Sequence, residues 1–295
     1  MNLFRALVFL LALSGSLSVF AAKLVVSIEP LAMLVEPLLG PDDSLRVLLK
    51  PNTSPHHYSL KASDMRALQQ ADLILWVGPE LEQFLQKPLA TLPAALQLDQ
   101  LAQLSWPDQA ELSEPHHSHA HTARDPHLWL NPDNALAVAN AVAQRLQALA
   151  GVDGAVVQAR LAVMQTRIAA LSVELERDLG ELRELQFMVY HQAYGHWNQR
   201  FGLTQLSAVS LTPEQKPGAR HIYQLKERAK DAQCLLAEAF YDNQSTQQLA
   251  KELGLPLVLL DPLGTNVAPG EHRYETLMRN LAADMKACLN HPANS

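Results

Sequence analysis

The sequence predicts an α/β protein with two lobes, each built on a parallel sheet, joined by one long rigid helix. Two observations carry this prediction. Short apolar runs rich in Val, Ile and Leu alternate with stretches of helical spacing, which is the pattern of βα units. Residues 155–185 then contain almost no Gly or Pro and repeat apolar side chains at helical spacing, as one long helix would.

The strand candidates are short, rich in Val, Ile and Leu and ended by Pro or Gly in several places, as expected of strands buried on both faces of a parallel sheet. They are residues 24–28, 45–49, 73–77, 187–190, 235–236 and 257–260. Helices are expected between them at residues 63–70, 81–87, 223–230 and 244–253. Ligands of such sheets bind outside the carboxyl ends of the strands, so residues that follow these runs are candidates for a site.

The middle of the chain is predicted to be helical over residues 133–148 and 155–185. Its regularly spaced leucines are typical of core packing, so we assign them no chemistry. About thirty helical residues would extend roughly 45 Å, which is long enough to bridge two lobes. We therefore expect an N-terminal lobe at 23–154, a connecting helix at 155–185 and a C-terminal lobe at 186–295.

The first 22 residues have the features of a secretory signal peptide. Arg5 supplies the positive charge, residues 6–17 are apolar, and small side chains favour cleavage near Ala21 or Ala22. The apolar run is too short for an ordinary transmembrane span, and no cysteine follows it to carry a lipid anchor. A buried N-terminal helix is the alternative, but no polar helical face is visible. We expect the mature chain to be free in an exported compartment, the periplasm.

Composition limits the classes of partner. The net charge of −7 argues against nucleic acid and against an anionic membrane, and 48% hydrophobic residues are enough for two cores. Cys234 and Cys288 are the only two cysteines. One disulfide is the simplest interpretation in an oxidising compartment, and two buried thiols are the alternative. With twelve histidines and so little cysteine, imidazole and carboxylate are the available metal ligands.

Three histidines each lie in a predicted loop that follows or borders an apolar run. His56 stands in Ser-Pro-His-His-Tyr, His127 in Asp-Pro-His-Leu-Trp and His191 in Val-Tyr-His-Gln-Ala-Tyr. Zinc fingers take ligands a few residues apart, whereas these histidines are far apart in the chain. A shared metal would therefore need a large preformed scaffold, as in a transport or catalytic site. Asp261, which follows the apolar run 257–260, adds a candidate carboxylate.

Each of these residues also has an interpretation without a metal. His56 could be a solvated side chain in a turn, His127 a hydrogen-bonded structural residue, and Asp261 a helix or turn cap. The adjacent His57 could take the place of His56. The tract that contains His116, His117, His119 and His121 is a compositional hint of metal binding in a loop.

Five segments, taken in order, resemble the metal-binding (cluster A-I) solute-binding proteins of ABC transporters, and among these the zinc-binding periplasmic members. They are Ser-Pro-His-His-Tyr-Ser-Leu at 54–60, Ala-Asp-Leu-Ile-Leu-Trp-Val-Gly at 71–78, Asp-Pro-His-Leu-Trp-Leu-Asn-Pro at 125–132, Tyr-His-Gln-Ala-Tyr-Gly at 190–195 and Leu-Asp-Pro-Leu-Gly at 260–264. The resemblance covers nearly the whole mature chain. It implies a metal cleft between two lobes, in a protein that captures Zn²⁺ and delivers it to an inner-membrane ABC permease with its ATPase.

The resemblance also implies a set of ligands. His56 and His127 of the first lobe and His191 of the second would bind the metal, and Asp261 occupies a position that is a ligand in some members and is replaced by water in others. Manganese-binding relatives have a carboxylate at the position of His191, so histidine there favours Zn²⁺. The Cys234–Cys288 pair matches a disulfide of some zinc members. We expect a monomer in which zinc is the transported ligand.

Three other functions stay open at this stage. An exported zinc hydrolase would use the same histidines with Glu238 as a general base, but the chain has no His-Glu-x-x-His motif. A manganese-specific protein of the same family is the second alternative. A metal buffer or adhesin-like surface protein without a permease is the third. The sequence favours transport over enzyme activity.

Overall fold

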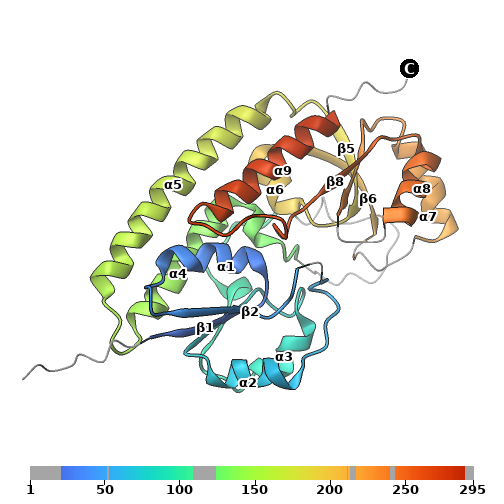
Figure 1. The fold of residues 1–295 in the computed structure, drawn as a ribbon. Helices are drawn as coiled ribbons and strands as arrows, with labels where there is room; N and C mark the ends of the chain where they lie inside the picture. The colour runs from blue at the N-terminus through green and yellow to red at the C-terminus, as the bar shows by residue number, and fades with distance from the viewer. Residues whose placement is uncertain are drawn as a thin grey trace, which may run out of the picture.

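The computed structural model describes residues 21–289, apart from residues 52, 109–123, 211, 213–216 and 240–242. The described chain forms two lobes, each with a four-stranded sheet and flanking helices (Figure 1). The strand order is β2-β1-β3-β4 in the first sheet and β6-β5-β7-β8 in the second, and all paired strands are parallel. The predicted α/β class with two parallel sheets is confirmed.

The first sheet contains three of the predicted strands and one that was missed. Its strands are β1 (Lys23–Val26), β2 (Ser44–Val47), β3 (Leu73–Trp76) and β4 (Ala95–Gln97). The helices of this part are α1 (Glu29–Val35), the 3₁₀ turn η1 (Glu36–Leu38), α2 (Ala62–Gln70) and α3 (Gln83–Leu89). Strand β4 has only three half-buried residues at the edge of the sheet, so no apolar run marks it.

The second sheet repeats the same strand order. Its strands are β5 (Gln186–His191), β6 (Thr204–Ser210), β7 (Leu235–Glu238) and β8 (Leu257–Leu260). Its helices are α6 (Gly195–Phe201), α7 (Ala219–Arg228) and α8 (Asn243–Leu253). Helix α6 ends at Gly202, whose φ of +68° is the left-handed conformation that glycine adopts without a steric penalty.

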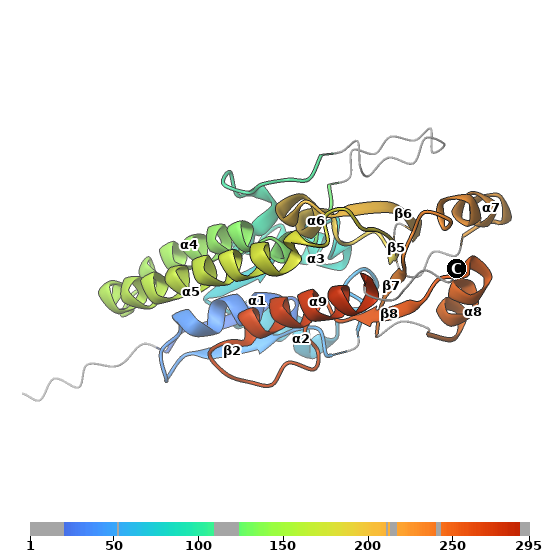
Figure 2. The ribbon, with the colours of Figure 1, turned by 90° about the horizontal axis from the view of Figure 1, so that it is seen from above.

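Helices α4 (Pro132–Gln147) and α5 (Gly154–Gly180) lie side by side next to the first lobe, and α5 continues along the second (Figure 1 and Figure 2). Asp153 begins α5, because its carboxylate accepts the backbone N–H groups of Ala155 and Val156. The 27 residues of α5 extend about 40 Å. The expectation that this helix continues to residue 185 is wrong. It ends at Gly180, a poor helix former, and residues 181–184 form turns before β5.

The last helix, α9 (Arg273–Leu289), was not predicted. It packs on β8 of the second sheet and also on α5 and α1, so this helix lies against both lobes (Figure 1). Arg273 at its start forms ion pairs with Glu29 and Glu36 of the first lobe. Near its end the predicted disulfide joins Cys288 to Cys234.

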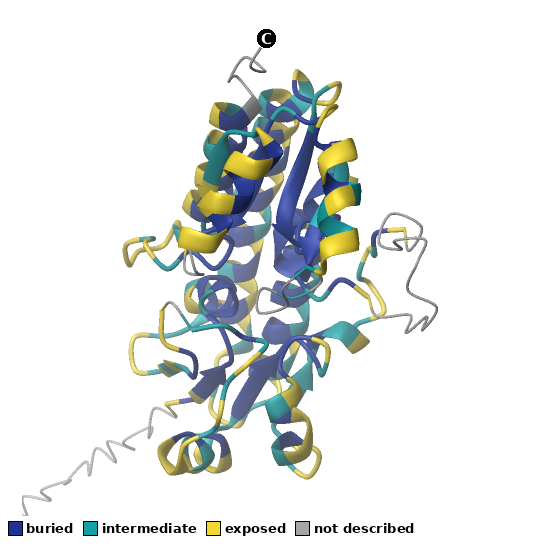
Figure 3. Ribbon diagram, turned by 90° about the vertical axis from the view of Figure 1, so that its right-hand side faces the viewer, coloured by how far each residue is buried: buried dark blue, intermediate teal, exposed yellow. Residues whose placement is uncertain are grey.

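Buried side chains fill both sheets and the region where the lobes meet (Figure 3). One continuous hydrophobic cluster extends from β1 and β3 through α4 and α5 to α6 and α9. The lobes therefore share part of their core, which fixes their relative position around the site. No helix among the described residues is long and apolar enough to cross a membrane. The lobe boundaries at residues 154 and 186 stay predictions.

Candidate metal centre

The structure brings the three predicted histidines together from distant parts of the chain. His56 lies in the loop between β2 and α2, His127 directly precedes the 3₁₀ turn η4 (Leu128–Leu130), and His191 is the last residue of β5. Each offers one ring nitrogen, and these three atoms lie within 4.8 Å of one another. Among the described residues this is the one group of three or more potential ligands close enough to share an ion.

The histidines line a small pocket between the lobes. Its lining residues are Pro55, His56, His127, Trp129, His191, Ala193, Glu238, Pro262 and Leu263. Proline, alanine, leucine and tryptophan supply an apolar wall, and the imidazoles supply the polar groups. The lining comes from both lobes, as the predicted metal cleft requires. The polar groups of the lining are therefore few: the three imidazoles and the Glu238 carboxylate.

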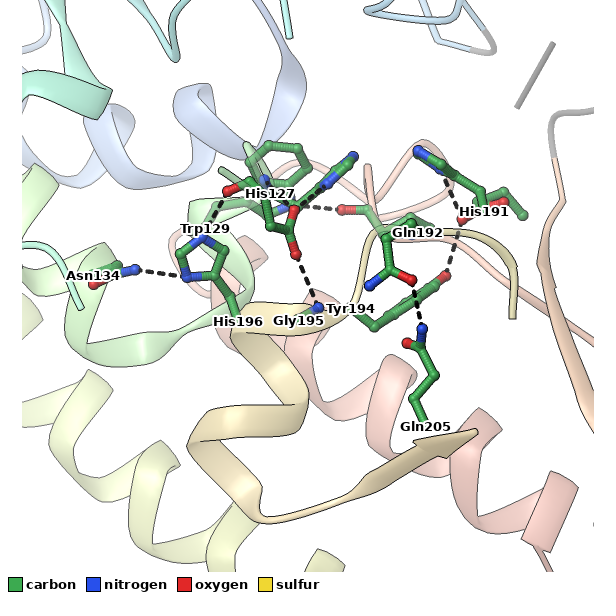
Figure 4. A network of polar contacts seen from close by, with 12 residues as sticks. His127, Trp129, Asn134, His191, Gln192, Tyr194, Gly195, His196 and Gln205 are labelled. Atoms are coloured by element: carbon green, nitrogen blue, oxygen red, sulfur yellow. Dashed lines mark hydrogen bonds and ion pairs between the residues drawn. The ribbon is translucent and has the colours of Figure 1, made fainter. Parts of the chain in front are cut away.

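In two of the imidazoles the Nδ1 atom faces a buried carboxylate. Asp125 Oδ1 accepts a hydrogen bond from His127 Nδ1 at 2.6 Å, and Glu238 Oε1 lies 3.4 Å from His191 Nδ1. A proton on Nδ1 facing a carboxylate leaves the lone pair on Nε2, the arrangement in which metal-binding histidines are commonly held. Figure 4 shows these contacts and the polar network around them. We assign the two tautomers from these contacts.

Burial lowers the pKa of two of the imidazoles, those of His56 and His127. Burial, together with the charges that His127 and His191 would carry, lowers the pKa of His56 to about 2. Burial also lowers the pKa of His127, although Asp125 opposes this shift. Burial alone would raise the pKa of Asp125, but the charge and hydrogen bonds of His127 hold it below its usual range. The cluster can therefore present lone pairs to a cation while Asp125 stays anionic.

The structure separates the two adjacent histidines of the first segment. His56 faces the pocket, and its buried Nε2 has no hydrogen-bond partner. His57 is exposed and does not line the pocket. A buried ring nitrogen without a partner costs free energy, so a ligand that accepts its lone pair would offset that cost. His56 is the better candidate of the two.

Asp261 is not part of the histidine group. Its Oδ2 accepts hydrogen bonds from Thr265 Oγ1 at 2.8 Å and from the backbone N–H of Asn266 at 3.2 Å. Its Oδ1 is buried and has no hydrogen-bond partner. The next two residues, Pro262 and Leu263, line the pocket. Ligation by Asp261 therefore stays a prediction, as does any role of His116, His117, His119 and His121, which lie outside the described residues.

Sequence reasoning assigned no role to Asp125 and read Glu238 only as a possible general base. Asp125 could have been noticed, because it stands two residues before His127 in a motif that was already singled out. No local signal connects Glu238 with His191, since the two lie on neighbouring strands. Trp129 ties the lobes together: its Nε1 donates to Pro262 O at 2.8 Å, and its carbonyl oxygen accepts from Tyr274 at 2.9 Å.

Comparison with known proteins adds independent evidence. The family model described as ZnuA, zinc-uptake complex component A, periplasmic, matches residues 24–288. The high-affinity zinc uptake system protein ZnuA of Haemophilus ducreyi is 30% identical over 308 aligned positions, covering 97% of this chain and 99% of the relative. The protein of the same name from Yersinia pestis is 29% identical, with 95% of each chain covered. A crystal structure of ZnuA has a TM-score of 0.73 at 24% identity, covering 90% of this chain and 99% of that one.

Proposed function

The chain belongs to the ZnuA family of periplasmic zinc-uptake components, and from this premise we propose that it captures Zn²⁺ and delivers it to an ABC importer. The observation that carries the proposal is the cluster of His56, His127 and His191, whose ligand atoms lie within 4.8 Å of one another between two lobes. The resemblance to metal-binding solute-binding proteins, inferred from five motifs, is thereby confirmed.

We propose that His56, His127 and His191 are the zinc ligands. Zinc accepts imidazole nitrogen readily and is commonly four-coordinate, so three histidines leave one position. Asp261 is the protein candidate for that position, because its Oδ1 is buried without a partner beside the pocket lining, and water is the alternative. Glu238 is proposed to orient the imidazole of His191, because its carboxylate faces His191 Nδ1 and is not part of the histidine group.

The donor set also favours zinc over manganese. Mn²⁺ prefers oxygen ligands and higher coordination, whereas imidazole suits zinc. Three imidazole nitrogen donors in a largely apolar pocket therefore support a zinc site, and they argue against a manganese-specific protein of the same family. Zinc here is cargo that must leave again, so it is the transported ligand and not a resident cofactor.

The proposed partners and location follow from family membership. We propose that the zinc-loaded protein docks on an inner-membrane permease with its ATPase, and that it acts as a monomer in the periplasm. The predicted signal peptide at 1–22, with cleavage near Ala21 or Ala22, supports export. Residues 1–20 lie outside the described part of the chain.

We also propose that the protein is not an enzyme. Its family is one of transport components. In the hydrolase alternative Glu238 would have to accept a proton from metal-bound water. Its Oε1 instead lies 3.4 Å from His191 Nδ1 and 3.4 Å from the Tyr194 hydroxyl. A carboxylate in that place is suited to orient the imidazole of His191, which is the role proposed for it here.

Transport in proteoliposomes tests the proposal. Vesicles containing the permease and ATPase that this protein serves would be supplied with the zinc-loaded protein outside and ATP inside. We expect zinc uptake and stimulated ATP hydrolysis with the native chain and with His57→Ala, whose altered side chain is exposed. His191→Ala should support neither. Equal uptake with His191→Ala, or none with the native chain, would contradict the proposed function.

A further inference from the structure

One buried carboxylate joins a candidate ligand of the first lobe to the main chain of the second. Asp125 Oδ1 accepts hydrogen bonds from Nδ1 of His127 at 2.6 Å and from its backbone N–H at 3.0 Å. Asp125 Oδ2 accepts the backbone N–H of Gly195 at 2.9 Å (Figure 4). Asp125 is only 4% exposed, so water competes little for these bonds.

The main chain of Asp125 is also held by a residue of α6, the helix that begins with Gly195. His196 Nε2 lies 2.9 Å from the carbonyl oxygen of Asp125, and His196 Nδ1 lies 3.1 Å from Asn134 Nδ2 (Figure 4). Because the Asn134 amide is a donor, Nδ1 must accept and Nε2 must donate to Asp125. Asn134 is fixed in turn by the backbone N–H and C=O of Ser105, at 2.8 and 2.9 Å. The start of α6 thus holds Asp125 by its side chain and by its main chain.

The contact leaves no spare room. A Cβ atom at Gly195 would lie 2.7 Å from Asp125 Oδ2 and 3.2 Å from Pro107 Cγ. Glycine is needed here for close approach rather than for an unusual backbone, because Gly195 has no positive φ. A single methyl group at Gly195 would therefore push the Asp125 carboxylate away from a hydrogen bond that it shares with His127.

We propose that Asp125 is a positioning residue that sets the imidazole of His127 for metal binding only while the second lobe is docked against it. This inference rests on the proposed function, since it takes His127 as a ligand. One carboxylate oxygen fixes the ring and the other is anchored by Gly195, which lies four residues after His191 on the same strand-to-helix connection. The two lobes' ligands are therefore linked through three hydrogen-bonded groups.

The linkage has a thermodynamic consequence. A bond that is present only when the lobes are docked, and that improves a metal ligand, couples docking to metal binding. Such coupling is reciprocal, so bound zinc must stabilise the Asp125–Gly195 contact to the same extent as the contact stabilises zinc. A residue that merely stabilises the fold would contribute equally with and without metal.

Gly195→Ala tests the inference from the lobe that does not carry His127. Its matched control is Gly180→Ala, because a Cβ at Gly180 meets no atom within 4 Å. We expect Gly195→Ala to weaken zinc binding by about 10- to 100-fold, as loss of an outer carboxylate contact commonly does. The visible spectrum of bound Co²⁺, which reports ligand geometry, should also change. Gly180→Ala should keep the native affinity and the native spectrum.

Asp125→Asn gives a second, isosteric test in case the larger residue at 195 disturbs folding. Asparagine has an NH₂ group in place of one of the two carboxylate oxygens. That group cannot accept a hydrogen bond, so the contact with either His127 or Gly195 is lost. Exchange of the Gly195 amide hydrogen, followed with and without zinc, should be slowed by zinc in the native chain and not in Asp125→Asn. Equal slowing in both proteins would overturn the inference, and so would native zinc affinity with a native Co²⁺ spectrum in Gly195→Ala.

These measurements distinguish a failure of the proposed zinc-binding function from a failure of the positioning role of Asp125. If the native chain itself binds no zinc, the proposed function fails. If the native chain binds zinc and both variants bind it equally well with the native Co²⁺ spectrum, the function stands and the positioning role of Asp125 fails.

Discussion

His191 Nδ1 lies 3.4 Å from Glu238 Oε1, so a buried carboxylate stands behind a proposed zinc ligand. Replacing this carboxylate by an amide in Glu238→Gln should weaken zinc binding by about 10- to 100-fold, because a neutral amide holds the Nδ1–H group of His191 in place less strongly than an anion does. Competition with a fluorescent zinc chelator measures the change. Glu252→Gln, an exposed carboxylate of the same lobe, is the control. Native affinity in Glu238→Gln would remove Glu238 from the site.

A buried carboxyl group in the first lobe predicts an unusual pH dependence of stability. Burial raises the pKa of Glu82 from 4.5 to about 7, although Ser27 and the backbone N–H groups of Val77 and Gly78 donate to it. In the folded protein the acid stays protonated between these values, whereas in the unfolded chain it does not. Its stabilising effect is therefore complete below pH 4.5 and is lost as the pH rises through 7, by about 3 kcal/mol in total.

Glu82→Gln isolates this effect because its side chain does not titrate. All other titratable groups are the same in the two proteins, so their contributions cancel in the difference. Relative to the variant, the native chain should lose about 3 kcal/mol of unfolding free energy between pH 4.5 and 7.5 in urea titrations of metal-free protein. Parallel pH curves would show that Glu82 titrates normally.

Much of the fold could be predicted because most strands contain an apolar run. Strands β1, β2, β3, β5, β7 and β8 were recognised in this way, both inside the sheets and at their edges. Strands β4 and β6 were missed, because β4 has only three half-buried residues and β6 alternates polar Thr, Gln and Ser with apolar residues. Helix α9 was missed although its buried residues Tyr274, Leu277, Leu281 and Met285 recur at helical spacing, so the sequence could have predicted the helix. Its packing on α1 and α5, far away in sequence, could not be predicted.

The identities of the candidate ligands could be predicted, but their orientation and their hydrogen-bond partners could not. The motifs named His56, His127 and His191, but in a loop without regular structure no periodicity tells which of His56 and His57 turns inward. The roles of Asp125 and Glu238 depend on contacts made after folding, since Asp125 reaches Gly195 across the lobes and Glu238 reaches His191 across the sheet. The oxygen ligand stays a prediction because Asp261 is bound to Thr265 and Asn266.

The ion pairs of Arg273 should matter more than a similar ion pair two turns further along α9. Arg273 is 11% exposed and contacts Glu29 and Glu36 across the lobes, whereas Arg279 is 48% exposed and contacts Glu174. Arg273→Ala removes this partner from the partly buried Glu29 and from the exposed Glu36, and it should cost about 2 kcal/mol of unfolding free energy. Arg279→Ala should cost less than about 1 kcal/mol. Equal costs for the two variants would contradict this difference in burial.

The disulfide between Cys234 and Cys288 ties the end of α9 to the start of β7 across 54 residues. On the chain-entropy view it should stabilise the protein by about 4 kcal/mol, by restricting the unfolded chain. Urea unfolding of the double variant Cys234→Ser, Cys288→Ser measures the loss. The same midpoint in reduced and oxidised native protein would show that the bridge contributes little.

The central claim is that His56, His127 and His191 form one zinc site between the lobes. Calorimetric titration of the metal-free native chain with Zn²⁺ and with Mn²⁺, repeated on His191→Ala and His57→Ala, tests it most directly. We predict tight one-to-one zinc binding and weak manganese binding in the native chain and in His57→Ala. In His191→Ala, zinc binding should weaken by more than about a hundredfold. A native chain without a tight zinc site, or a zinc site unaffected by His191→Ala, would contradict the claim.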